Sequence, residues 1–293
     1  MNLPSVTIKQ LLEAGVHLGH KTFRWNPKMK KYIFGSKDSI HIIDLVQTLE
    51  MTNAALVAIH KCISSGGKIL FVSTKKQATE IISTLAKDTS QYYVNHRWLG
   101  GMLTNLKTIS NSIKYYKKLS EDLKKENKGF TKKEILKMGA ERDKLERSLG
   151  GISEMQKIPD MIFIIDTNIE ALAVKESLKL DIPIVAVIDT NSDPTGINFP
   201  IPGNDDARRA INLYCELVKK TILDAQKYIS KKENGLEKSK TSKEEKQVEA
   251  KEKNQEIKVE VKADKTKNKE KTIIKKTKSI FSKVKDLAKK KSK

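Results

Sequence analysis

The chain has 293 residues, of which 38% are hydrophobic and 32% are charged, and its formal net charge is +21. This length allows one large domain or two small ones, and the positive charge favours a polyanionic partner over a merely soluble basic protein. The N-terminal sequence MNLPSVTIKQ lacks the apolar core of a secretory signal and the Arg/Ser bias of a transit peptide, and no run is long enough to span a bilayer. We therefore expect a cytoplasmic protein without a membrane partner.

A basic, aromatic run over residues 20–31 is the first informative segment. Its cations, aromatic residues and proline are Lys21, Arg24, Lys28, Lys30, Lys31 and the pairable His20, with Phe23, Trp25 and Pro27. No helical or strand period organises the run, and the Asn-Pro step at 26–27 favours a turn. Cations displace counterions from phosphate, and aromatic or guanidinium planes stack on bases, so the run predicts RNA contact through Lys21, Arg24, Trp25, Lys28, Lys30 and Lys31. The alternative is a charged surface loop whose Phe23 and Trp25 lie in the core.

Short apolar runs alternate with helical patterns over most of the chain. The runs rich in β-branched residues are 68–73, 92–94, 161–166 and 183–189, and the helical patterns are 45–65, 75–88, 169–180 and 205–229. The apolar runs lack polar alternation, as expected for parallel strands that are covered on both faces. We therefore predict an α/β fold, a three-layer sandwich around a parallel, flavodoxin-like or Rossmann-like sheet.

Residues 104–151 interrupt this alternation with two heptad-like stripes. The first stripe is Leu106, Ile109, Ile113, Tyr116, Leu119 and Leu123, and the second is Ile135, Met138, Leu145, Leu149 and Ile152, with an Asn-Lys-Gly step at 127–129 between them. The pattern predicts an antiparallel helical hairpin inserted into an α/β domain of residues 1–103 and 152–230. Glycine pairs at 100–101 and 150–151 would let the hairpin leave and re-enter the sheet domain at a sharp angle. Two ordinary packed helices are the alternative.

The composition changes abruptly over residues 231–293. This segment holds 23 Lys and no Arg against 11 acidic residues, a net charge of +12 that leaves +9 for the rest of the chain. Large apolar residues are nearly absent from 231 to 271, and such a segment cannot bury enough surface to fold. We therefore expect a disordered Lys/Glu-rich tail, with a short amphipathic helix over 272–290 that can form on a partner.

The predicted strand ends carry no phosphate-binding loop. Ser73-Thr74-Lys75-Lys76 follows the first predicted parallel strand, and no GxGxxG motif occurs. The glycine pair at 66–67 precedes its strand and lacks the spacing of a phosphate-binding loop. A nucleotide site at the carboxyl edge of the sheet is therefore not indicated, and we expect no small-molecule substrate.

Carboxylates do follow the predicted strands. Asp166 and Asp189 end two of them, and further aspartates stand at 193, 205 and 206. Because carboxylates at strand ends can hold a divalent cation, His17, Asp189 and Asp205 are candidates for a structural metal site. Helix capping and turn formation explain the same aspartates more simply, and we expect no cofactor. No nucleophile elbow or paired catalytic spacing accompanies them, so we expect no enzymatic activity.

Other cations are distributed over predicted loops and helix starts. They are Lys75, Lys76, Arg97 beside Trp98, Lys107, Arg208 and Arg209. Each one alone could be a solvated surface charge. As a set they suit an irregular, folded RNA better than a regular major groove, and we predict that they contact RNA.

Several long blocks of the sequence follow one another in a fixed order. They are GVHLGH, RWNPKM, YIFG and IHIIDL in residues 15–45, then GGKILFVSTKKQA, NHRWLGGMLTN, IPDMIFIID, PIVAVIDTNSDP and PIPGNDDARRAI, ending at residue 211. In this order the blocks resemble the ribosomal protein S2 family of the bacterial small subunit. The resemblance covers roughly residues 3 to 228, and blocks of this length are more specific than any single short motif.

The resemblance implies a structural component of the small ribosomal subunit, located in the cytoplasm on the ribosome. It implies a seat on the back of the subunit between head and body, contact with small-subunit rRNA and other small-subunit proteins, and help in recruiting ribosomal protein S1. It also implies that the hairpin is a coiled coil. One rival hypothesis is a metal-dependent enzyme at Asp166 and Asp189. The other is a general nucleic-acid binder whose Lys-rich tail supplies all the affinity.

Overall fold

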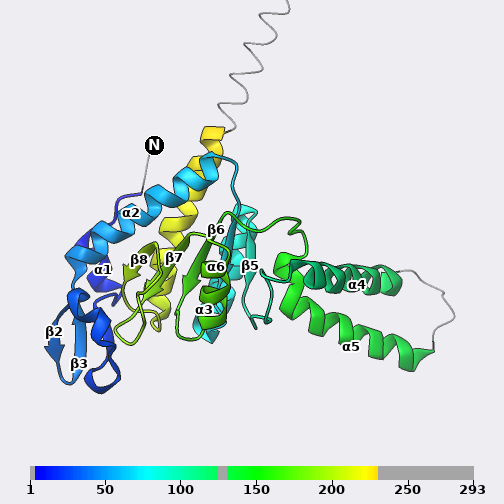
Figure 1. Cartoon of the computed structure of the whole chain (residues 1–293), viewed down its shortest axis with the longest axis horizontal. Helices are drawn as coiled ribbons and strands as arrows, with labels where there is room; N and C mark the ends of the chain where they lie inside the picture. Colours follow the sequence, from blue (N-terminus) through cyan, green and yellow to red (C-terminus); the bar gives the residue numbers. More distant parts are fainter. Residues whose placement is uncertain (1–3, 125–130, 230–293) are drawn as a thin grey trace, which may run out of the picture. The chain divides into compact units, whose positions relative to one another are not determined.

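Five parallel strands form the central sheet of the computed structural model, which describes residues 4–124 and 131–229 (Figure 1). In sheet order they are β5 (Tyr92–Val94), β4 (Ile69–Val72), β6 (Met161–Ile165), β7 (Ile184–Ile188) and β8 (Phe199–Pro202). In chain order this is 2-1-3-4-5, the flavodoxin-like arrangement, so the predicted fold class is confirmed. Every residue of β4, β6 and β7 is buried, which explains their unbroken apolar sequences.

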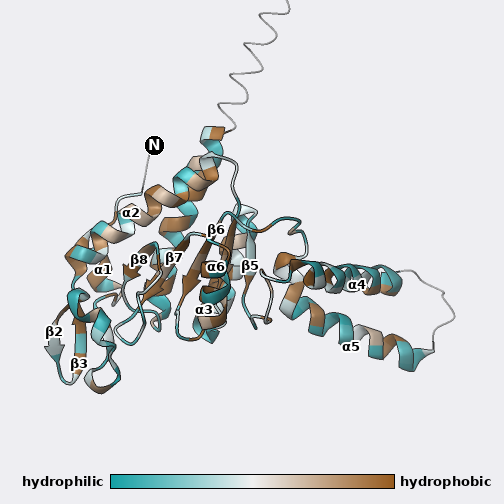
Figure 2. Cartoon of the chain, viewed as in Figure 1, coloured by the Kyte–Doolittle hydropathy of each residue, from teal (hydrophilic) through white to brown (hydrophobic). Residues whose placement is uncertain are grey.

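Helices cover both faces of this sheet. The helices are α1 (Ile8–Glu13), α2 (Leu45–Ser64), α3 (Lys76–Thr89), α6 (Ala171–Lys179) and a last helix over residues 208–229. Successive strand residues alternate between two cores: Phe71 and Phe163 pack with α2, α3 and the last helix, whereas Val72 and Ile164 pack with α6 and the residues around Trp98. Figure 2 shows the apolar strands between amphipathic helices. The three-layer prediction is therefore correct.

A small antiparallel sheet, which the sequence analysis did not predict, flanks the basic run in the N-terminal block. Its strands are β1 (Leu18–Lys21), β2 (Ile33–Lys37) and β3 (Ile40–Ile43), in the order β1-β3-β2. Two 3-10 turns, Thr22–Arg24 and Pro27–Tyr32, hold the basic residues between β1 and β2. The strands are short, half exposed and interrupted by register shifts, so no long alternation marks them in the sequence.

Strand β8 was also not predicted, because two of its four residues are prolines. Proline cannot donate to a ladder, so it is confined to edge strands and bulges. β8 is the edge of the five-stranded sheet and pairs only with β7. Proline is therefore tolerated there.

The two heptad-like stripes form α4 (Leu106–Lys124) and α5 (Lys132–Leu149), beside the β5 edge of the sheet (Figure 1). The Tyr115 hydroxyl donates a 3.2 Å hydrogen bond to Glu141 across the pair. Ile109, Ile113, Leu119 and Leu149 of the two helices are buried, whereas Ile135 is 47% exposed. The expected turn at 127–129 lies outside the described residues.

The predicted domain boundaries stay a prediction. Contacts group Met1–Ser230, including α4 and α5, into one compact unit. The expected tail over 231–293, with its amphipathic helix at 272–290, lies outside the described residues. Among the helices that are described, none combines the length and the apolar character needed to cross a bilayer.

One glycine of each predicted pair has a specific structural reason. Gly101 has a φ of +80°, a left-handed conformation that favours glycine. A Cβ atom on Gly151 would lie 2.1 Å from the backbone oxygen of Tyr93, so the chain after α5 can approach β5 this closely only without a side chain. By contrast, a Cβ atom on Gly139 in α5 would meet nothing within 4 Å.

We predict that Gly151→Ala lowers the free energy of unfolding by about 1–3 kcal/mol, because β5 or the segment after α5 must shift to accept the methyl group. Gly139→Ala is the matched control, and it should be neutral or stabilise by up to about 1 kcal/mol through helix propensity. Urea titration of both full-length variants checks this. Equal stability of the two variants would contradict the close approach of residue 151 to β5.

Candidate nucleic-acid interface and its anchor

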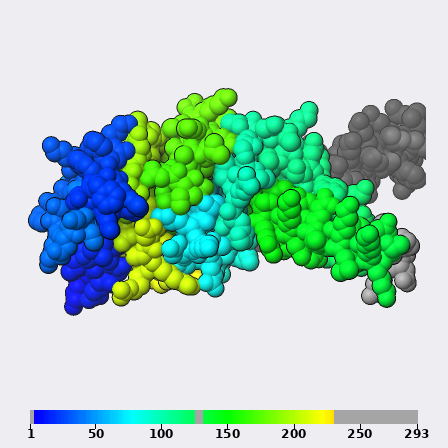
Figure 3. Space-filling model, turned by 90° about the horizontal axis from the view of Figure 1, so that it is seen from below, coloured from blue at the N-terminus to red at the C-terminus, as the bar shows by residue number. Residues whose placement is uncertain are grey.

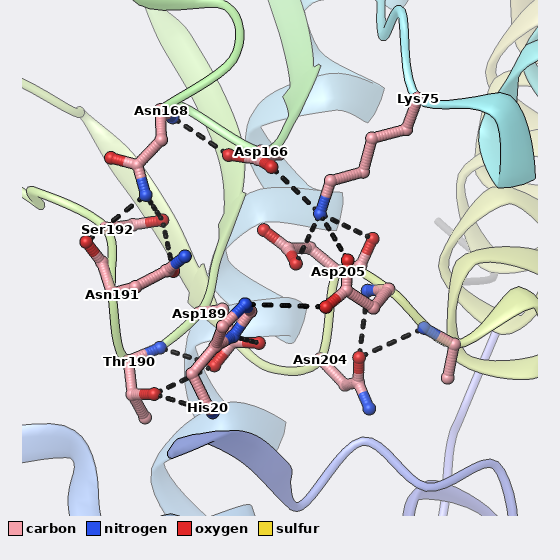
Figure 4. Close-up of polar contacts among 12 residues, drawn as sticks. His20, Lys75, Asp166, Asn168, Asp189, Thr190, Asn191, Ser192, Asn204 and Asp205 are labelled. Atoms are coloured by element: carbon pink, nitrogen blue, oxygen red, sulfur yellow. Dashed lines mark hydrogen bonds and ion pairs between the residues drawn. The ribbon is translucent and has the colours of Figure 1, made fainter. Parts of the chain in front are cut away.

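Polar residues from four segments converge at the carboxyl edge of the parallel sheet (Figure 4). Parallel pairing in register brings the ends of β4, β6, β7 and β8 to the same edge. Lys75 follows β4, Asp166 follows β6, Asp189 follows β7, and Asp205 and Asp206 follow β8. We call these five residues together with His20 the edge cluster.

Lys75 is the centre of the edge cluster. Its ammonium nitrogen lies 2.8 Å from Asp166 Oδ2, 2.7 Å from Asp205 Oδ1 and 2.7 Å from Asp206 Oδ1, and its side chain is only 9% exposed. Burial alone would lower the pKa of Lys75, but the three carboxylates outweigh burial and raise the pKa above its ordinary value. The charge of Lys75 is therefore paired within the protein, which does not favour the predicted contact with RNA, and that contact stays a prediction.

The carboxylates have distinct surroundings. Asp166 Oδ1 accepts a 2.9 Å hydrogen bond from the backbone of Asn168 in the turn before α6, whose N-cap residue is Glu170, while its Oδ2 binds Lys75. Asn204, rather than Asp205 or Asp206, accepts the backbone N–H groups before the last helix. Burial and the nearby Asp189 and Asp166 raise the pKa of Asp205 to about 7, although Lys75 lowers it.

His20 joins the N-terminal block to this edge. Its Nδ1 lies 2.8 Å from Asp189 Oδ2, its Nε2 lies 3.5 Å from Asp206 Oδ2, and its backbone N–H donates to Thr190 Oγ1 at 2.9 Å. The hydrogen bond to Asp189 raises the pKa of His20, against the lowering effect of burial. The N-terminal block is thus tied to the sheet by both side-chain and backbone contacts.

The predicted metal set of His17, Asp189 and Asp205 needs one correction. Within the described residues, the group of side chains placed to hold a metal contains His20 with Asp189, Asp205 and Asp206, and not His17. His20 lies in β1, whereas His17 lies in the turn that precedes this strand. The sequence contained both histidines, but only the fold decides which of them faces the aspartates.

The basic turns after His20 lie over the connection between β7 and β8. The Lys28 ammonium lies 2.8 Å from Asp193 Oδ2 and donates to Thr195 Oγ1 at 2.9 Å, and Asn26 N–H donates to the Thr190 carbonyl at 2.8 Å. Hydrogen bonds from Lys28 and Thr195 lower the pKa of Asp193 to about 2. In Figure 3 the N-terminal residues, in blue, lie against the later strand connections.

The rest of this turn region faces outward. Lys21, Arg24, Lys30 and Lys31 are exposed, and Phe23 and Trp25 are 72% and 36% exposed. Met29 and Tyr32 are its buried residues instead. The alternative that placed Phe23 and Trp25 in the core is therefore wrong for Phe23, and the Trp25 ring is only partly covered, 5.4 Å from the His41 ring.

Trp98 differs from the expectation for an RNA-stacking residue. It is only 7% exposed, and its indole N–H donates to Glu176 at 3.1 Å. Glu176 also accepts the backbone N–H groups of Gly101, Leu103 and Thr104, so it holds the segment that leads into α4. Trp98 thus has a structural contact, its neighbour Arg97 is exposed, and RNA contact by either residue stays a prediction.

The remaining residues that are predicted to contact RNA lie on the surface. Lys76, Lys107 and Arg209 are exposed. Arg208 is exposed too, and its guanidinium pairs with Glu80 at 2.8 Å. These four residues stay predictions, and the turns over 21–31 remain the densest group of exposed cations and aromatic rings named by the sequence.

We predict that Lys75→Met destabilises the full-length protein by about 3–5 kcal/mol, because it leaves several carboxylates buried without their cation. Lys76→Met, one residue further on at an exposed position, is the matched control and should change the stability by less than about 0.5 kcal/mol. Thermal and urea unfolding of both variants measure this. A small effect of Lys75→Met would show that the edge cluster does not depend on its ammonium group.

Known proteins are similar in sequence to most of this chain. The family model described as Ribosomal protein S2 matches residues 11–225. Relatives from Sinorhizobium medicae and Parvibaculum lavamentivorans, both named "Small ribosomal subunit protein uS2", are 58% and 56% identical over 224 residues, or 76% of this chain and 88% of each relative. A relative of the same name from Phenylobacterium zucineum is 58% identical over 224 residues, 76% of each chain. The chain therefore belongs to the ribosomal protein S2 family.

Proposed function

We propose that this protein is a structural component of the small ribosomal subunit, without catalysis, and that it works in the cytoplasm on the ribosome. The observation that carries the proposal is family membership over residues 11–225, because the relatives are named as small-subunit proteins. The basic composition of the chain agrees with a polyanionic partner. Small-subunit rRNA and neighbouring small-subunit proteins are the partners that follow.

Contact with rRNA is assigned to the exposed turns over residues 21–31. Lys21, Arg24 and Lys30 form no ion pair within the described part of the chain, so their charges are available to phosphate. Phe23 lies beside Arg24, whose guanidinium carbon is 5.5 Å from the ring centroid. An exposed ring with a cation over it can stack on a base or a sugar of single-stranded RNA.

A role in recruiting ribosomal protein S1 is a further part of the proposal. Its support is the resemblance of the sequence blocks in residues 15–211 to the family. The geometry of the edge cluster has no part in this support. The seat between head and body has the same support. The rival of a metal-dependent enzyme is disfavoured because the relatives are named as ribosomal proteins.

We predict that a triple variant, Lys21→Ala, Arg24→Ala and Lys30→Ala, binds small-subunit rRNA with a lower salt dependence. Three lost phosphate contacts should reduce the slope of log K against log salt by about 2 to 3. The matched control replaces Lys61, Lys87 and Lys179, cations at the helix ends that precede β4, β5 and β7 and thus at the opposite edge of the sheet. Filter binding at several salt concentrations measures both. Equal slopes for the two variants would show that the turns do not contact RNA phosphate.

We also predict that deletion of residues 231–293 leaves specific assembly intact while it weakens salt-sensitive, non-specific RNA binding. The deletion removes a net charge of +12 but no residue of the matched segment 11–225. Co-sedimentation with small subunits through a high-salt sucrose gradient tests this for the full chain and for the deletion variant. Release of the full chain as free protein would contradict the proposed function, and release of the deletion variant alone would favour the tail as the main source of affinity.

A further inference from the structure

The side of the edge cluster that faces His20 has the composition of a cation site. His20, Asp189, Asp205 and Asp206 each offer one ligand atom, and these four atoms lie within 4.8 Å of one another. The side chains of Asp189 and Asp205 are 1% and 0% exposed, that of His20 is 19% exposed, and that of Asp206 is 54% exposed. The site is therefore deep on one side and open to solvent at Asp206.

An unpartnered oxygen points to a missing ligand. Asp205 Oδ1 binds Lys75, but Asp205 Oδ2 is buried and has no hydrogen-bond partner. Buried carboxylate oxygens are almost always paired, because an unpaired one loses its hydration without compensation. Asp205 Oδ2 is therefore a candidate ligand atom for a second cation in the edge cluster.

The charges of the edge cluster lead to the same conclusion. Three carboxylates, those of Asp166, Asp205 and Asp206, surround the single ammonium group of Lys75, while Asp189 pairs with His20. Lys75 contacts Asp205 and Asp206 through their Oδ1 atoms. Asp206 Oδ2 lies 3.5 Å from His20 Nε2, and Asp205 Oδ2 is buried without a hydrogen-bond partner. A second cation between these oxygens and the imidazole would balance the remaining negative charge.

The orientation of His20 fits a ligand role. Asp189 Oδ2 lies 2.8 Å from His20 Nδ1, and an ionised carboxylate at this position accepts a hydrogen bond from the Nδ1–H group. The lone pair of the neutral ring is then on Nε2, which faces Asp206 Oδ2 at 3.5 Å. A carboxylate that holds one imidazole nitrogen while the other binds the ion is the common second-shell arrangement of histidine–metal sites.

We propose that His20 Nε2, Asp205 and Asp206 bind one divalent cation of the Mn²⁺ or Zn²⁺ class, with Asp189 orienting His20. The imidazole ligand favours these ions over Mg²⁺ and Ca²⁺, which prefer all-oxygen sites. Water can complete the coordination from the open side at Asp206. The ion clamps β1, and with it the basic turns, onto the ends of β7 and β8. This inference does not depend on the proposed function, because it concerns the isolated chain.

The test is a titration of the full-length, chelator-stripped chain with MnCl₂, followed by calorimetry and by the loss of the free Mn²⁺ EPR signal. Mn²⁺ is chosen because it has little affinity for the free thiols of Cys62 and Cys215. We expect one site per chain, an affinity for Mg²⁺ at least about tenfold weaker, and a higher melting temperature with Mn²⁺ bound.

Three variants make the test specific. Asp205→Asn and His20→Gln should each weaken Mn²⁺ binding at least about tenfold. Asp193→Asn is the matched control, an aspartate on the same connection that pairs with Lys28 outside the proposed site, and it should bind as the unaltered chain does. If Asp205→Asn does not fold, His20→Gln decides the matter. Absence of a site in the unaltered chain, or equal binding by all variants, would overturn the proposal and identify His20 as an ordinary ion-pair partner.

Discussion

The burial of one ammonium group among carboxylates organises the functional end of this protein. Lys75 has to be matched by negative charge because a buried cation without partners is costly. Its partners come from the end of β6 and from the loop after β8, so the ion pairs hold separate strand connections at fixed positions. The same carboxylates, with Asp189, then receive His20 from the N-terminal block. The position of the basic turns therefore depends on the charge balance beneath them.

This arrangement gives the carboxyl edge of the sheet an unusual use. In doubly wound α/β folds this edge is where a ligand normally binds. Here Lys75, His20 and the turns over 21–31 occupy it, and the N-terminal block covers it with its own small sheet. The flavodoxin-like sheet thus supports the turns over residues 21–31. This fold by itself implies neither nucleotide binding nor enzymatic activity.

The sequence predicted those features that depend on neighbouring residues. The strands β4, β6 and β7 are visible because every residue of each is apolar and buried, and α4 and α5 are visible from their spacing. Features that depend on distant residues were missed or misread. Lys75 looked like a free cation because its partners Asp205 and Asp206 are 130 and 131 residues away, and Trp98 looked exposed because its partner Glu176 is 78 residues away. The choice between His17 and His20 likewise required the direction in which each side chain leaves the chain.

The anchoring of the basic turns has a consequence for RNA recognition. Asn26 and Lys28 fasten the turns to the connection after β7, and His20 fastens their start to Asp189. Much of the conformational entropy of the turns is therefore lost on folding, and less remains to be lost when RNA binds. In the proposed interface, exposed cations such as Arg24 and Lys30 would then meet phosphate from a fixed backbone. We expect Lys28, which is engaged with Asp193, to contribute to that interface mainly by positioning its neighbours.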